Sequence, residues 1–251
     1  PATILVKRDG PLVQIRSDDP GGGWRPLTAD LLRYESMLTE VSDLRRAPEL
    51  LAVRDLIRSW RFYDHFRTDA LAPARQVQIG TRSPVLDNDG RDLAATWATI
   101  REIGDETTLA ALVDDAFPGS RLSIDVHAGR FDLRFHGSGL LRPLSTAELS
   151  DGTLRYLLLI AALLSPRPPG LMVLNEPETS LHPELLAPLA RLMVTAAERS
   201  QVLIITHASA LVDALRESST VTTVELIKEW GETRIAGQGA LGGPIWSWGT
   251  R

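Results

Sequence analysis

The most constraining feature of the sequence is a short apolar run that ends directly in polar and acidic residues. The run Leu171 to Leu174 is followed at once by Asn175 and Glu176, and a second strand-like run, Val202 to Thr206, is followed by His207. Helical patterns separate these runs, and apolar strands that alternate with helices indicate a parallel sheet covered by helices. Because ligands bind at the carboxyl ends of strands in open parallel sheets, we expect these polar side chains to lie together if the two strands are neighbours.

Carboxylates in this place suit phosphoryl transfer, because developing phosphate charge needs a metal and the attacking water needs a base. The turn Ser150-Asp151-Gly152 opens the preceding helix. Its free backbone N–H groups and positive helix end favour an anion, and Gly152 permits close approach. Each signal alone has an ordinary structural alternative. Ser150 is equally explained as a helix N-cap, and His207 as a packed or hydrogen-bonded histidine.

The first half of the chain reads as mixed elements. We expect a hairpin over Thr3 to Ser17 around Asp9-Gly10, a loop over "DDPGGGWRP", and a second hairpin around Ala128-Gly129. Helices are expected over three segments: Ala47 to Arg67, Asp92 to Ile103 and Thr107 to Phe117. The aromatic and basic end of the first helix, "WRFYDHFR", either packs the helix end or stacks nucleic-acid bases.

The second half follows the strand and helix order described above. A helix is expected over Pro183 to Ala197, with Pro183 in its first turn and a kink at Pro188. Two short strands are expected near Val221 to Ile235, and the C-terminal "GGPIWSWGTR" reads as a loop with an aromatic anchor. We divide the chain into the end of an antiparallel β subdomain (1–20), a helical and β-hairpin middle region (21–140) and a core lobe (141–251).

Composition excludes several classes of site. The chain has no cysteine, which rules out disulfides, zinc–thiolate sites and thiol nucleophiles and points to the cytoplasm. A net charge of -5 provides no overall electrostatic footprint for nucleic acid. The longest apolar run, Tyr156 to Leu164, is too short to span a membrane, so we expect no membrane partner. The five histidines show no H-E-x-x-H or comparable metal-ligand spacing, which disfavours a metal hydrolase.

The ordered set "LSDGT", an apolar helix, "LMVLNEPETSLHP", a helix and "VLIITHAS" resembles the ATPase heads of the ABC class. It is most similar to the RecF- and SMC-like predicted ATPases grouped with AAA-type ATP-binding proteins. The resemblance covers Leu144 to about Leu215. It implies an α/β fold of the P-loop NTPase type, with a parallel sheet flanked by helices and with β-hairpin and helical insertions. It also implies ATP and Mg²⁺ as cofactors and a homodimer that encloses ATP.

The resemblance also implies roles for single residues. Ser150, Asp151 and Gly152 correspond to the signature motif, which faces the nucleotide of the opposite protomer, and "LMVLNE" corresponds to the Walker B strand. Glu176 corresponds to the general base that orients the attacking water, and His207 to the switch histidine that senses the γ-phosphate. The D-loop at the dimer interface corresponds to the segment Thr179, Ser180, Leu181, His182 and Pro183.

The sequence departs from this pattern in two ways. Asn175 stands where the family usually has an Asp that steadies the magnesium shell, so it keeps an acceptor oxygen but lacks the charge. No G-x-x-x-x-G-K-[S/T] phosphate loop occurs, and Gly21-Gly22-Gly23 lacks the lysine. Family members carry that loop near the N-terminus, before an antiparallel β subdomain. Since the chain starts at Pro1 and leads directly into a strand-like run, we expect the loop in a segment upstream; its natural loss is the alternative.

Two functions therefore remain open. One is an ATP-hydrolysing head that dimerises around nucleotide and, by family analogy, works with DNA or a partner nuclease in DNA repair or defence. The other is a degenerate, non-hydrolysing interaction module that uses the same dimer surface. Asn175 and the missing phosphate loop favour the second.

Overall fold

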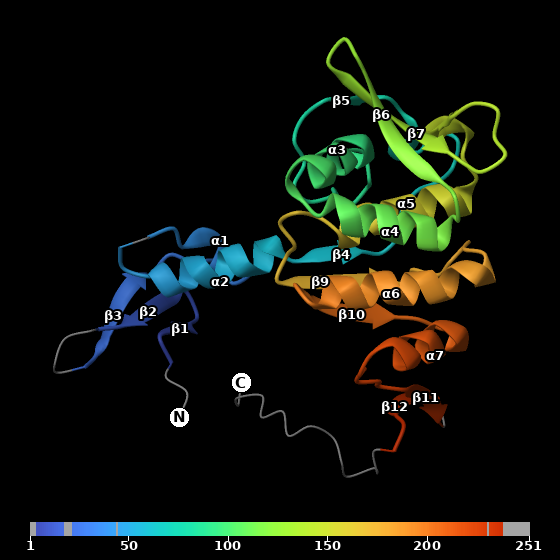
Figure 1. Ribbon diagram of the computed structural model, residues 1–251. Helices are drawn as coiled ribbons and strands as arrows, with labels where there is room; N and C mark the ends of the chain where they lie inside the picture. Colours follow the sequence, from blue (N-terminus) through green and yellow to red (C-terminus); the bar gives the residue numbers. More distant parts are fainter. Residues whose placement is uncertain (1–3, 18–21, 44, 230, 238–251) are drawn as a thin grey trace.

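A parallel sheet of three strands lies at the centre of the protein (Figure 1). The computed structural model describes residues 4–17, 22–43, 45–229 and 231–237. The sheet has the order β10-β9-β4, and both strand pairs are parallel. Its strands are β4 (Arg61–Tyr63), β9 (Leu171–Asn175) and β10 (Gln201–Ile205). The two apolar strands are neighbours, which is the condition under which their polar ends were expected to meet.

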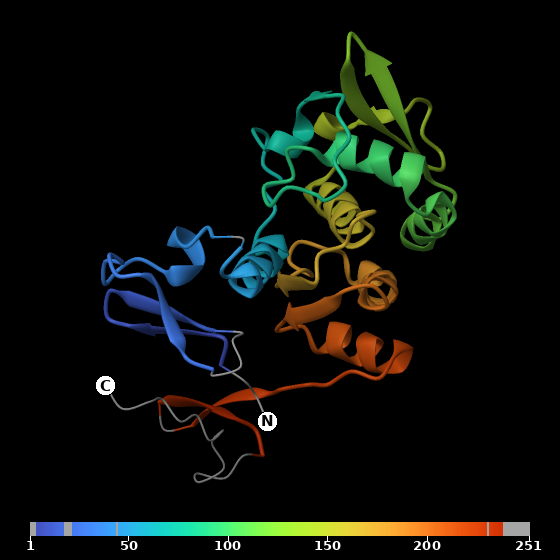
Figure 2. The same ribbon diagram turned by 90° about the vertical axis from the view of Figure 1, so that its left-hand side faces the viewer.

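Three helices cover one face of this sheet (Figure 2). They are α5 (Asp151–Leu163), α6 (Leu186–Ala197) and α7 (Ser209–Ser218). Helix α5 is buried along nearly its whole length. Met172 and Leu174 of β9 are fully buried against these helices, with Val202 and Ile204 of β10 beside them. This face and its helices form the main hydrophobic core.

The opposite face of the sheet is uncovered. Side chains alternate between the two faces of a strand. Phe62, Val173 and Leu203 are partners across the three strands and share this face, and Ile205 lies on it one row further. Phe62, Leu203 and Ile205 are 55%, 52% and 47% exposed. An apolar sheet face of this kind is one that folded proteins normally bury.

The N-terminal part forms a separate unit with its own small core. Its antiparallel sheet has the order β1-β2-β3, and Val13, Leu31, Val41, Ala47 and Leu50 form the core. Both views show this unit to one side of the central sheet, joined to it through α2 (Figures 1 and 2). The elements are β1 (Val6–Asp9), β2 (Leu12–Arg16), β3 (Trp24–Thr28), α1 (Met37–Glu40) and α2 (Pro48–Ser59).

The middle of the chain adds two helices and a second antiparallel sheet above α5 (Figure 1). The sheet has the order β5-β7-β6, and β8 also pairs with β7, at Arg134 and Phe135. Its elements and their neighbours are η1 (Pro73–Arg75), β5 (Gln78–Ile79), α3 (Leu93–Ile103), α4 (Glu106–Ala116), β6 (Arg121–His127), β7 (Arg130–His136), β8 (Leu144–Ser145) and η2 (Thr146–Glu148). The hairpin around Ala128-Gly129 and both middle helices are confirmed.

The chain after α7 forms a final hairpin of β11 (Leu226–Glu229) and β12 (Glu232–Ile235), which confirms the two short strands. The predicted hairpin around Asp9-Gly10 is also confirmed by the pairing of β1 and β2. The predicted C-terminal loop over 242–251 lies outside the described residues. None of the helices in the described part of the chain has the length and apolar character that a membrane span requires.

Three local predictions are wrong. The helix expected up to Arg67 ends at Ser59, and the aromatic segment after it is β4, because Phe62 and Tyr63 pair with β9. The loop expected over 18–26 ends earlier, since Trp24 begins β3. Pro188 is not in a helix interior. A 3₁₀ turn, η3 (Pro183–Leu185), precedes α6, so Pro188 lies in the first turn of α6, where no backbone N–H is required.

Candidate functional site

The carboxyl edge of the parallel sheet brings together the side chains that follow β9 and β10. Glu176 follows β9 directly, and its backbone N–H donates to the carbonyl of Ile205, the last residue of β10. This extends the strand pairing by one residue and brings His207 within reach. His207 Nε2 lies 3.4 Å from Glu176 Oε1. The expected meeting of these two residues is therefore present, and both have solvent access.

Glu176 holds a backbone conformation that is rare for a residue with a side chain. Its φ is 43°, in the left-handed region. Two bonds to its carbonyl oxygen hold the turn: the N–H of Thr179 donates at 3.1 Å and Arg155 Nη2 donates at 3.2 Å. Strain of this kind persists where surrounding contacts over-determine it, and it is frequent at functional sites. Here it turns the Glu176 carboxylate out of the strand direction toward His207.

Glu178 fixes the loop that carries the histidine. Its Oε1 accepts hydrogen bonds from the hydroxyl of Thr206 and from the backbone N–H of His207 at 3.3 Å. Within the described residues, its Oε2 is buried without a hydrogen-bond partner. The sequence analysis assigns no role to Glu178. The structure makes it the brace between the turn after β9 and the turn after β10.

Asp64 is a site residue that the sequence analysis missed. It directly follows β4, and its Oδ1 accepts a hydrogen bond of 2.6 Å from Asn175 Nδ2. Asn175 and Ile205 are partners at the ends of β9 and β10, and Asp64, the first residue after β4, bonds to Asn175 from the other side. In the sequence, Asp64 directly follows the aromatic pair Phe62-Tyr63. The sequence analysis expects a helix over this segment and therefore does not place Asp64 at the sheet edge.

Ser150 and Gly152 lie at the amino end of α5. Ser150 is the N-cap: its Oγ accepts from the Thr153 N–H at 3.2 Å and lies 2.8 Å from Thr153 Oγ1. The N-cap interpretation is thus confirmed, and Ser150 remains exposed. Gly152 packs against its own chain, since a Cβ atom there would lie 2.7 Å from the carbonyl oxygen of Ser180. The absence of a side chain at Gly152 lets the two turns meet.

The expected D-loop residues surround this contact. Thr179 Oγ1 lies 3.5 Å from Glu176 Oε2, and Ser180 has a left-handed φ of 66°. His182 is exposed and caps η3, accepting a 3.4 Å hydrogen bond from the Glu184 N–H. Both strained positions of this loop therefore contact α5, Glu176 through Arg155 and Ser180 through Gly152.

Arg155 links α5 to the carboxyl edge of the sheet from inside the core. Only 3% of it is exposed. Its Nη2 donates to the Glu176 carbonyl, and its Nη1 lies 3.3 Å from His65 Nδ1, which is the acceptor because a guanidinium only donates. Burial lowers the pKa of Arg155, and the nearby Glu178 and Glu176 carboxylates oppose that shift. An arginine nevertheless stays protonated, so it supplies a fixed positive charge beneath the two carboxylates.

The site has few groups for a metal ion. In the described part of the chain, no three His, Cys, Asp or Glu side chains converge as a metal-binding group. Mg²⁺ fits this arrangement, because it keeps several waters and needs only one or two carboxylates in addition to substrate phosphates. Asp64 and Asn175, with one charge between them, are the oxygen donors placed for it.

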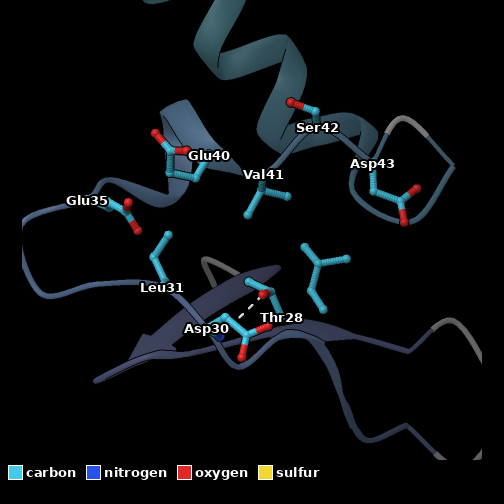
Figure 3. A pocket seen from close by; sticks show the side chains of 9 residues that line it. Thr28, Asp30, Leu31, Glu35, Glu40, Val41, Ser42 and Asp43 are labelled. Carbon is cyan, nitrogen blue, oxygen red and sulfur yellow. Dashed lines mark hydrogen bonds between the residues drawn. The ribbon is translucent and has the colours of Figure 1, made fainter.

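One pocket lies elsewhere and holds none of these residues. It has a volume of about 330 Å³ and lies between the N-terminal sheet and α1 (Figure 3). Four carboxylates line it, those of Asp30, Glu35, Glu40 and Asp43. Two of them already accept backbone hydrogen bonds, Glu35 from Leu32 and Asp43 from Arg45 and Arg46. The pocket is part of the loop packing of this unit and not of the edge that carries Glu176.

Comparison with known protein families decides the class. The family described as "AAA domain, putative AbiEii toxin, Type IV TA system" matches residues 17–213. The chain belongs to this AAA-domain family. The match contains Ser150, Glu176 and His207 and also the aromatic segment that forms β4. No curated protein matches the chain.

Solved structures of SMC ATPase heads are similar to this AAA domain in fold. An SMC head bound to the C-winged helix domain of ScpA has a TM-score of 0.50 at 14% identity, covering 89% of this chain and 67% of that one. The SMC head domain from Thermotoga maritima has 0.44 at 15%, covering 92% and 71%. An SMC head from Pyrococcus furiosus, bound to the C-terminal domain of ScpA, has 0.45 at 13%, covering 59% and 37%. The chain thus spans about a third of the Pyrococcus protein. The fold is the P-loop NTPase α/β fold that the sequence predicts.

The contact between Gly152 and Ser180 predicts the effect of one methyl group. Helix propensity alone would make Gly152→Ala stabilising by about 1 kcal/mol. The clash with the Ser180 carbonyl should reverse that sign and cost about 1–3 kcal/mol, as overpacking does. Urea unfolding of the 251-residue chain measures the difference. Gly23→Ala is the control, because nothing lies near a Cβ atom there. A Gly152→Ala protein as stable as the parent would contradict the contact.

Proposed function

We propose that this AAA domain is the ATP-binding and ATP-hydrolysing head of an SMC- and RecF-like protein, which dimerises around nucleotide. One observation carries the proposal. Glu176 and His207 meet at 3.4 Å where two adjacent parallel strands end, beside the turn that opens α5. This is the edge at which parallel α/β sheets bind ligands. A carboxylate and an imidazole in contact there have the chemistry that activates a water and senses a phosphate.

Each residue has a role in this proposal. Glu176 accepts a hydrogen bond from the attacking water and orients it, and its strained turn fixes the direction of the carboxylate. His207 contacts the terminal phosphate. When that phosphate leaves, the change is passed to α7 through the turn after β10, which Glu178 holds in place. Arg155 donates from inside the core to the Glu176 carbonyl and so holds the turn that carries the base. Ser150 and Gly152 present the helix end to the nucleotide of the partner protomer.

We assign Asp64 and Asn175 to Mg²⁺. When bound, Mg²⁺ neutralises phosphate charge and holds the phosphate oxygens in line. Asp64 supplies the carboxylate that Asn175 lacks, and the 2.6 Å hydrogen bond between them keeps the amide oxygen of Asn175 free to face the ligand. An Asn at position 175 in place of the usual Asp therefore weakens the Mg²⁺ site, but Asp64 keeps one negative charge there.

The uncovered sheet face supports a phosphate loop in an upstream segment. Phe62, Val173, Leu203 and Ile205 form an apolar surface on the side of the sheet opposite the helices. A strand and helix carrying the phosphate loop would cover this face and bring its backbone N–H groups to the same edge. This segment would bind the α- and β-phosphates. The sequence given has no G-x-x-x-x-G-K-[S/T] motif that could bind them.

The proposed dimer is inferred from the surface that carries the Ser150 turn. We propose a homodimer in which the exposed Ser150 turn and the D-loop residues Thr179, Ser180 and His182 face the partner. The division 1–20, 21–140 and 141–251 is kept as a functional one, although β3 extends the first sheet to Thr28 and β4 joins the core sheet. The family description names a putative toxin of a toxin–antitoxin system, which favours a cytoplasmic role in defence over DNA repair. DNA or a nuclease would be the partner.

The second candidate is a degenerate module that dimerises without turnover. The loss of charge at Asn175 favours it, and so does the absence of a phosphate-loop motif in the sequence. Asp64 weighs against it, because a carboxylate is present beside Asn175. The left-handed turn at Glu176 weighs in the same direction, since strained backbone of this kind clusters at functional sites.

Replacing the proposed base separates the two candidates. In the full-length protein, Glu176→Gln should keep ATP affinity but lower hydrolysis by about 10²-fold or more, because the amide cannot accept a proton from the water. The ATP-bound dimer should accumulate. Steady-state phosphate release and light scattering measure the two effects. Glu198→Gln, the same change at an exposed position on α6, should have neither effect. Equal turnover in Glu176→Gln and the parent would remove Glu176 from the mechanism.

Restoring the missing charge tests the magnesium assignment. Asn175→Asp places a second carboxylate against Asp64. Without a cation the two should repel and lower the melting temperature in EDTA, and Mg²⁺ should recover it. In the full-length protein, the Mg²⁺ concentration for half-maximal activity should fall. Asn88→Asp, an exposed charge control, should change neither value. An unchanged or higher Mg²⁺ requirement would show that Asn175 does not face the metal.

A further inference from the structure

Arg75 forms an unusual set of contacts with the turn that opens α5. It lies at the end of η1, in the loop after β4, and only 7% of its side chain is exposed. Its Nη1 donates to the carbonyls of Thr146, Ala147 and Leu149, at 3.0, 3.2 and 2.8 Å. Its Nε donates to the carbonyl of Thr68 at 2.9 Å. One buried guanidinium thus satisfies the carbonyls at the end of η2, which no further helical turn can satisfy.

The remaining nitrogen of Arg75 binds Asp151. Arg75 Nη2 lies 2.7 Å from Asp151 Oδ1, and the Asp151 side chain is 62% exposed. Asp151 is the first residue of α5 and follows Ser150. A free carboxylate at this position would repel an anion that approaches the helix end. The guanidinium neutralises that charge and draws the carboxylate away from the exposed Ser150 hydroxyl.

The loop that carries Arg75 starts at the sheet edge. Asp64 at its beginning accepts the hydrogen bond from Asn175, and Arg75 at its end holds the Ser150 turn. The same loop therefore touches the carboxyl end of β9 and the amino end of α5. A planar five-donor group is required at its end, because a lysine ammonium cannot span three carbonyls and a carboxylate in this geometry.

We propose that Arg75 is a positioning residue for the Ser150 turn, and that Asp151 is the anchor of Arg75 and not a nucleotide ligand. The inference rests on the proposed function. Arg75 sets the position of the turn and removes the charge that would oppose the terminal phosphate of the nucleotide on the partner protomer. It contacts neither nucleotide nor water. Its effect falls on dimer closure and turnover, and the nucleotide affinity of the monomer does not depend on it.

The first test is Arg75→Met in the full-length protein, with adenylyl imidodiphosphate as the nucleotide. Dimerisation followed by analytical ultracentrifugation should weaken by about tenfold or more, and kcat for ATP should fall by a similar factor. Nucleotide affinity below the dimerising protein concentration should change less than about twofold. Arg75→Lys should recover part of the loss. Arg67→Met removes a similar arginine–aspartate pair from the same loop, one that is exposed, and serves as the matched control.

The second test removes the charge of Asp151. Its side chain is 62% exposed, so we expect the substitution to leave folding intact. Adding Asp151→Asn to Arg75→Met should recover dimerisation in part, because the unpaired carboxylate is then gone. Asp151→Asn alone should change the dimer affinity by less than about threefold, because the amide oxygen can still accept from Arg75 and the charge it removes is already neutralised. Loss of dimerisation in Asp151→Asn, or parent-like dimerisation and kcat in Arg75→Met, would overturn the inference. A parent protein that neither dimerises with nucleotide nor hydrolyses ATP would instead overturn the proposed function.

Discussion

The pairing of three parallel strands determines where every candidate catalytic group lies. Strand β9 is the middle strand, so its carboxyl end has a neighbour on each side. The neighbour β4 contributes Asp64, and β10 leads into His207. The hydrogen bond from the Glu176 N–H to the Ile205 carbonyl carries the register past the strand end. A shift of either strand by one residue would place these side chains on opposite faces of the sheet.

Motifs that combine local chemistry with a strong period could be predicted from the sequence. The apolar runs before Asn175 and His207 predict the two main strands. A short, continuous apolar run bounded by polar residues is typical of a buried strand in a parallel sheet. Ser150 was identifiable as the start of a helix, since a serine before an apolar helical pattern is a strong capping signal. The meeting of Glu176 and His207 followed from the sheet rule on the condition that the two strands are neighbours.

Contacts between segments far apart in the chain could not be predicted. Strand β4 has only three residues, too few for a period, and its aromatic side chains also suit a helix end. Missing it concealed Asp64. Arg75 reaches residues more than 70 positions away through a loop without a motif. The reason for a glycine at position 152 is likewise tertiary, because the atom it avoids belongs to Ser180.

The central claim has two parts. In this proposal the chain carries the base, the switch histidine and the Ser150 turn. The groups that bind the α- and β-phosphates belong to the segment that would cover the exposed sheet face. Calorimetry of the 251 residues with ATP and Mg²⁺ tests this claim most directly. The account predicts a dissociation constant above about 1 mM and no phosphate release, with tight binding restored by the upstream segment. Micromolar binding of ATP by the 251 residues alone would contradict it, because the phosphate site would then lie within this chain.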